Sequence, residues 1–146
     1  MGLPVAKIGI VPCSGEALPA GTVCRLACRR VLDNLRKGQT VAICLPLFIA
    51  GGEEERSFAA RHPTITVDGC EKQCAAKATE MFSGKPAQAL LIPDILEKRG
   101  IPMPTRLRGF GAEEEFAVQA VADEIAETVD AVLAQIRAEG KPYGDL

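Results

Sequence analysis

The chain has 146 residues, which is the usual size of one domain and enough to bury a hydrophobic core without disulfides. Its net charge is −2, and its Lys and Arg residues are scattered, whereas a nucleic-acid binder needs clustered positive charge. With no Trp and a single Tyr there is little material for base stacking, so we expect no nucleic-acid partner.

No apolar run has the length of a membrane span. The N-terminus also lacks the charged region, long apolar stretch and small-residue cleavage site of a signal peptide. We therefore expect a cytoplasmic protein without a membrane partner.

The first half of the chain alternates β-rich and helical stretches. The apolar run PVAKIGIVP predicts a strand over Pro4–Pro12. Apolar residues at helical spacing then predict a helix over Leu18–Lys37, which ends before a glycine that suits a helix C-terminus. The run QTVAICLPLFI predicts a second buried strand over Gln39–Ile49, broken near Pro46. A short helix with an acidic first turn, Glu53–Arg61, and a β-branched third strand, Thr64–Val67, follow.

The second half continues the alternation and ends in a long helix. We expect a helix over Glu71–Phe82, a short fourth strand over Ala89–Ile92 and a helical turn over Asp94–Lys98. Pro and Gly residues mark Gly100–Gly111 as a loop. Glu113–Glu139 has one apolar stripe and predicts an amphipathic helix, after which the tail KPYGDL is expected to fray.

Strands that alternate with helices indicate parallel βαβ crossovers. The predicted fold is an α/β, Rossmann-like sandwich with a small, mostly parallel sheet flanked by helices and closed by the long C-terminal helix. There is no internal repeat, so residues 1–146 are expected to form a single domain.

Six cysteines are unusual for a chain in a reducing compartment, where short cysteine spacings indicate metal or redox chemistry rather than disulfides. Cys13 follows the first predicted strand, Cys44 lies toward the end of the second, and Cys70 follows the third. The carboxyl ends of parallel strands meet at one edge of the sheet, where ligands bind. We therefore expect these three thiols to converge there.

Cys74 adds a fourth thiol, because Cys70 and Cys74 form a C-x3-C pair. A helix that starts near Cys70 places both thiols on one face, and its N-terminal dipole favours thiolate. Gly69 allows a tight turn before the helix, and Asp68 can accept amide hydrogen bonds there or support a ligand. Any single cysteine is more often a buried hydrophobe than a ligand. Four at strand ends and a helix start favour one shared metal, and four thiolates suit tetrahedral zinc.

Two further cysteines, Cys24 and Cys28, also have C-x3-C spacing, but they fall inside the first predicted helix. That spacing puts them on its buried stripe, so we interpret them as core residues rather than additional ligands or a redox pair. The C-x5-R match from Cys24 to Arg30 lacks the phosphate-cradling loop that phosphatase chemistry needs. His62, the single histidine, is predicted to lie on a surface loop.

The segment VDGCEKQCAAK resembles the DGC-domain family, which takes its name from an Asp-Gly-Cys motif. The similarity extends over most of the first 85 residues, with PCSG at Pro12–Gly15 and CLPL at Cys44–Leu47, and this order of motifs is specific. The resemblance implies no settled activity. It implies zinc bound by cysteines, which correspond here to Cys13, Cys44, Cys70 and Cys74.

Two functions from different classes are compatible with these residues. In the first, the protein is a non-enzymatic metal-binding module that holds Zn²⁺. In the second, the same cysteines carry out thiol-redox chemistry or hold an iron–sulfur cluster for electron transfer. The sequence contains no nucleotide-binding fingerprint and no convincing acid/base pair, which favours metal binding without catalysis.

Overall fold

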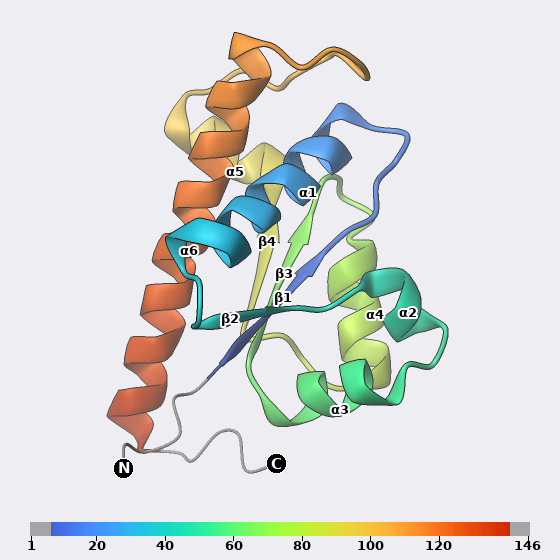
Figure 1. The fold of residues 1–146 in the computed structure, drawn as a ribbon, viewed down its shortest axis with the longest axis vertical. Helices are drawn as coiled ribbons and strands as arrows, with labels where there is room; N and C mark the ends of the chain where they lie inside the picture. Colours follow the sequence, from blue (N-terminus) through green and yellow to red (C-terminus); the bar gives the residue numbers. More distant parts are fainter. Residues whose placement is uncertain (1–6, 141–146) are drawn as a thin grey trace.

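A computed structural model describes residues 7–140, and its centre is a four-stranded sheet in the order β2-β1-β3-β4 (Figure 1). Every neighbouring pair of strands is parallel. The strands are β1 (Ile8–Pro12), β2 (Thr40–Ala42), β3 (Thr64–Asp68) and β4 (Gln88–Leu91). The central strand β3 is buried along its whole length, as expected for a parallel sheet with both faces covered.

Helices cover the two faces of this sheet. They are α1 (Pro19–Arg30) with a π-helical continuation η1 (Val31–Leu35), α2 (Leu45–Ile49), α3 (Glu53–Arg61), α4 (Cys74–Phe82), α5 (Ile92–Arg99) and α6 (Ala112–Glu139). Helices α1, α5 and α6 pack together in one layer, and α2, α3 and α4 form the other (Figure 1). The strand order explains this arrangement, since right-handed crossovers that leave β1 and β3 in opposite directions fall on opposite faces.

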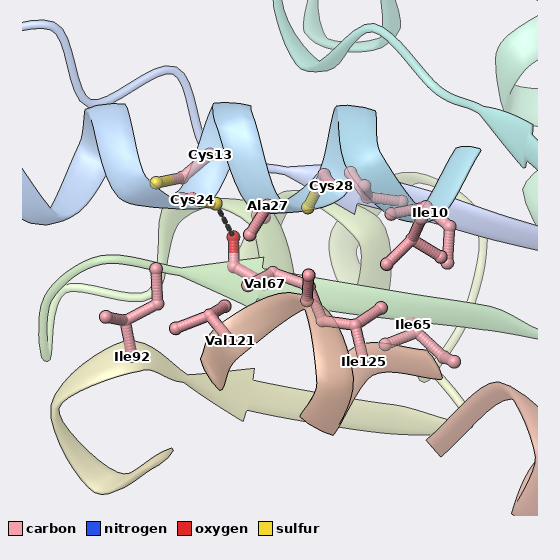
Figure 2. Close-up of a cluster of buried hydrophobic side chains, with 14 of the residues drawn as sticks. Ile10, Cys13, Cys24, Ala27, Cys28, Ile65, Val67, Ile92, Val121 and Ile125 are labelled. Carbon is pink, nitrogen blue, oxygen red and sulfur yellow. Dashed lines mark hydrogen bonds between the residues drawn. The ribbon is translucent and has the colours of Figure 1, made fainter. Parts of the chain in front are cut away.

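The hydrophobic core lies between the sheet and the layer of α1 and α6 (Figure 2). Ile65 and Val67 of β3 point toward Val121 and Ile125 of α6, and Cys24 of α1 lies above them. All five side chains are almost fully buried. The alternation of strand side chains sends the remaining β3 residues toward the opposite layer.

The predicted fold class is confirmed, including the parallel sheet and the long final helix. Two boundaries were wrong. The predicted second strand ends at Ala42, and its apolar continuation is the helix α2, with Pro46 in the first turn, where proline is tolerated. Cys44 therefore precedes a helix instead of lying in a strand. Helix α4 begins at Cys74 and not at Glu71, because Gln73 before it is left-handed, with φ of 52°.

Parts of two predicted elements lie outside the described residues: the first residues of the Pro4–Pro12 strand and the whole KPYGDL tail. Within residues 7–140, none of the helices is long and apolar enough to cross a membrane.

The prediction that His62 lies on a surface loop was wrong. Only 7% of its surface is exposed, and its ring stacks on Phe58 with the ring centroids 4.0 Å apart. Neither ring nitrogen has a hydrogen-bond partner among the described residues. Burial lowers the pKa of His62, with a smaller contribution from the charge of Arg61. The residue is therefore held as a neutral imidazole in the interior.

The free energy of unfolding should fall as the pH drops below about 6.5, the ordinary pKa of histidine. In that range the unfolded chain binds a proton at His62 while the folded chain, with its lowered pKa, does not, so protonation favours unfolding. Urea unfolding at pH 7.5 and pH 5.5 measures the effect. His62→Phe keeps the stack on Phe58 and should lose less stability between the two pH values than the wild type. Equal losses in both proteins would contradict the assignment.

Candidate functional site

A cavity of about 550 Å³ opens at the carboxyl edge of the sheet, between the start of α1, the helix α2 and the loop from β3 to α4. The chain leaves β1 toward one side of the sheet and β3 toward the other, so the cavity lies at the point where the strand order reverses. Ligand sites of open parallel sheets occur at such switch points. Its walls are formed by Cys13, Ser14, Gly15, Leu18, Gly21, Leu45, Pro46, Ile49, Asp68, Gly69, Cys70 and Cys74.

The structure brings three of the four predicted metal ligands to this cavity. Cys13 is buried, Cys70 is half-buried and Cys74 is exposed, and each forms part of the wall. Cys44 is exposed and is not part of the wall, although its neighbour Leu45 is. Of the three strand-end thiols expected to converge, Cys13 and Cys70 therefore share one cavity, which Cys74 joins, whereas Cys44 does not line it.

The thiols as they stand do not form a coordination shell. Over residues 7–140, no three His, Cys, Asp or Glu side chains are placed to hold one metal ion. The donor chemistry fits zinc, since the cavity offers several thiols, but their present arrangement does not. Binding would therefore require the side chains to move toward one another.

Asp68 fixes the start of α4. Its carboxylate accepts hydrogen bonds from the backbone N–H groups of Ala75 and Ala76, at 2.8 and 3.1 Å, and only 2% of its surface is exposed. Burial raises the pKa of Asp68, and the two amides oppose that shift. The expected amide hydrogen bonds are thus present, but they reach the helix across the intervening loop. That loop, which carries Cys70, is held at both of its ends.

Glycines allow the loops after β1 and β3 to approach α1 closely. A Cβ on Gly21 would lie 1.8 Å from the carbonyl oxygen of Gly15, and one on Gly69 would lie 3.0 Å from the carbonyl carbon of Ala20. The backbone bends at Gly69 as predicted, but its φ is not positive, so glycine is needed there for the close approach to α1. The contact between Gly15 and Gly21 has no recognisable signal in the sequence beyond the two glycines themselves.

Cys13, Cys24 and Cys28 form a buried thiol row that leads from the cavity into the core (Figure 2). The N–H of Cys13 donates to the carbonyl of Val67 at 2.9 Å, the same carbonyl that the Cys24 thiol reaches, and Cys28 lies one helical turn beyond Cys24 in α1. The N–H of Gly69 donates to Cys13 Sγ at 3.3 Å, and Cys24 Sγ donates to the carbonyl of Val67 at 3.1 Å. The buried position predicted for Cys24 and Cys28 is confirmed, but the position of Cys24 beside Cys13 was not anticipated.

Two thiols of the buried row, Cys13 and Cys24, have raised pKa values and so resist ionisation. The neighbouring Cys24 thiol, followed by burial, raises the pKa of Cys13 well above its ordinary value. The hydrogen bond with Cys13 lowers the pKa of Cys24, but Cys28 and burial together outweigh it and raise that pKa. Once one thiol has ionised, loss of the proton from a neighbouring thiol places a second negative charge beside the first. This repulsion is unfavourable, so neighbouring thiols tend to keep their protons.

Comparison with known protein families gives a match that covers most of this chain. The model of the family described as "DGC domain" matches residues 9–132, which include all six cysteines. No curated protein and no solved structure gives a significant match.

Replacing Gly21 by Ala should destabilise the protein by about 1–3 kcal/mol, because the added methyl group meets the Gly15 backbone. The direction of the stability change is informative, since replacing Gly by Ala at an unconstrained helix position stabilises a protein by roughly 0.5–1 kcal/mol. Thr22→Ala, at the next helical position, is the matched control and should stay within about 0.5 kcal/mol of wild type. Urea unfolding measures all three proteins. A more stable Gly21→Ala variant would show that the loops are not in close contact.

Proposed function

The chain belongs to the DGC domain family, and from that premise we propose that the cavity at the carboxyl edge of the sheet binds one zinc ion through cysteine thiolates. The observation that carries the proposal is the position of Cys13, Cys70 and Cys74 on the wall of a single cavity at the switch point. Cys44, which precedes the wall residue Leu45, is the fourth proposed ligand.

The local environment supports these assignments. Cys13 is the most constrained of the four thiols, and the amide of Gly69 that points at its sulfur would stabilise a thiolate. Cys44 and Cys74 are exposed, so their side chains can change rotamer at little cost. Cys70 lies in a loop fixed by the Asp68 hydrogen bonds at one end and the left-handed Gln73 at the other. A rigid ligand at the base and movable ligands at the rim would allow the shell to assemble around the ion.

Zinc would bind to this chain by taking the place of the protons on the cysteine thiols. Each cysteine must lose its proton to bind the ion, so binding releases protons and becomes tighter as the pH rises. The positive charge of the ion also offsets the mutual repulsion that keeps neighbouring thiols protonated. We propose binding without a catalytic step, since the wall of the cavity is otherwise apolar, apart from Ser14 and the already hydrogen-bonded Asp68.

One equivalent of zinc per chain is expected after chelator-free, anaerobic purification, as measured by elemental analysis. Cys70→Ser and Cys74→Ser should each abolish stoichiometric binding, whereas Cys24→Ser and Cys28→Ser should leave it intact. Cys44→Ser should weaken binding without abolishing it, because a water molecule can occupy a fourth position.

Less than about a tenth of an equivalent of every transition metal would contradict the proposal, since zinc–thiolate sites bind tightly. Brown protein that contains iron would instead identify an iron–sulfur cluster on the same cysteines. A requirement for Cys28 would show that the ligand assignment is wrong.

Removing the metal should leave most of the fold intact. The core between the sheet and α6 consists of apolar side chains from several elements, and those of β3 and α6 at its centre are not part of the cavity wall. Chelation should therefore lower the melting temperature while far-UV circular dichroism keeps most of its helical signal. Hydrogen exchange should increase in the loops at residues 12–15 and 68–74 and stay low in Ala112–Glu139. A random-coil spectrum at room temperature would show instead that the metal organises the whole domain.

A further inference from the structure

The buried thiol row contains a pair that the zinc proposal leaves unexplained. Cys24 is completely buried, yet its thiol donates to the Val67 carbonyl at 3.1 Å, and the same carbonyl accepts the N–H of Cys13 at 2.9 Å, so Cys24 lies beside a residue of the cavity wall. Cys24 belongs to α1, and Cys13 belongs to the loop that follows β1, so the two thiols approach from different elements (Figure 2).

The fold favours one pairing within the row. Cys24 and Cys28 lie one turn apart in α1, and helical geometry keeps such Cβ atoms about 5–6 Å apart. A disulfide needs Cβ atoms about 3.5–4.5 Å apart, so a bond between these two would distort the helix. Cys13 is not bound by that constraint, because it precedes Gly15 in a segment without regular secondary structure.

We propose that Cys13 and Cys24 form a reversible disulfide by exchange with a small, uncharged disulfide that enters the cavity. The apolar walls formed by Leu18, Leu45 and Ile49 favour an uncharged reagent over a charged one. Cys24 has no exposed surface, so an external reagent reaches it only through the sulfur of Cys13. Cys13 is therefore the entry thiol, and Cys24 is the resolving thiol.

The exchange has two steps. Cys13 loses its proton and attacks one sulfur of the reagent R–S–S–R, which forms a mixed disulfide and releases the first R–S⁻, protonated to R–SH. Cys24 then loses its proton and attacks the Cys13 sulfur, which forms the protein disulfide and releases a second R–SH. The protein loses two protons and two electrons in total, and the reagent gains both.

Peptide mapping of the metal-free wild-type chain tests the pairing. The protein is incubated with 2-hydroxyethyl disulfide, its remaining thiols are alkylated, and it is digested with trypsin. Cys13 and Cys24 lie in one tryptic peptide, residues 8–25, whereas Cys28 lies in the separate peptide of residues 26–29. The proposed disulfide therefore appears as an unalkylated 8–25 peptide that has lost two hydrogen atoms. A cross-link between the two peptides, or full alkylation of both cysteines, overturns the proposal.

Two matched variants establish the order of the steps. Cys28→Ala should still give the internal disulfide. Cys24→Ala should stop at the first step, so that Cys13 retains the mixed disulfide with mercaptoethanol. An unmodified Cys13 in a Cys24→Ala protein whose circular dichroism matches wild type would overturn its role as the entry thiol. The experiment needs no bound metal, so its result is separate from that of the zinc measurement.

Discussion

The close contact between the start of α1 and the loops after β1 and β3 is the constraint on which the site depends. Gly21 lies against the Gly15 carbonyl, and Gly69 lies against the backbone at Ala20, so neither glycine has room for a side chain. This contact draws the two loops together over the ends of the central strands. As a result, Cys13 and Cys70 face the same cavity although they belong to different crossovers.

Cys13 occupies the boundary between two environments. Its sulfur accepts a hydrogen bond from the Gly69 amide beside the cavity, and its own N–H shares the Val67 carbonyl with the buried Cys24 thiol. A sulfur in a disulfide cannot also act as a thiolate ligand, so the two proposed roles of Cys13 exclude each other. Oxidation of the pair would then remove the most rigid ligand from the metal site, which would couple zinc occupancy to the thiol–disulfide balance of the surroundings.

The sequence predicted what depends on local pattern and on topology. Alternating strands and helices gave the parallel sheet, and placement of Cys13 and Cys70 after strands gave their convergence. What it could not predict depends on contacts between distant segments. The apolar run through Leu45–Ile49 fits a strand or a buried helix equally well, and only tertiary packing decides between them.

Because a sequence pattern does not report contacts between distant segments, the environment of His62 was predicted wrongly and that of Cys24 only in part. His62 lies between Arg61 and Pro63, which suggested a loop, but its ring is buried and stacks on Phe58, which these neighbours in the sequence do not indicate. Cys24 was correctly predicted to be buried from its helical spacing. Its position beside Cys13 depends on how α1 crosses β1, which the spacing within α1 does not define.

The Asp-Gly-Cys triplet combines three separate physical tasks in consecutive positions. Asp68 accepts the first free amides of α4, Gly69 permits contact with α1 and donates its own amide to Cys13, and Cys70 faces the cavity. None of the three residues can take over the role of another. A carboxylate is needed for the amides, a residue without Cβ is needed for the contact, and a thiol is needed for the proposed metal ion. The triplet therefore joins hydrogen bonding at the start of α4, loop packing and one wall of the cavity at one corner of the fold, so a change at any of its positions is expected to alter the cavity.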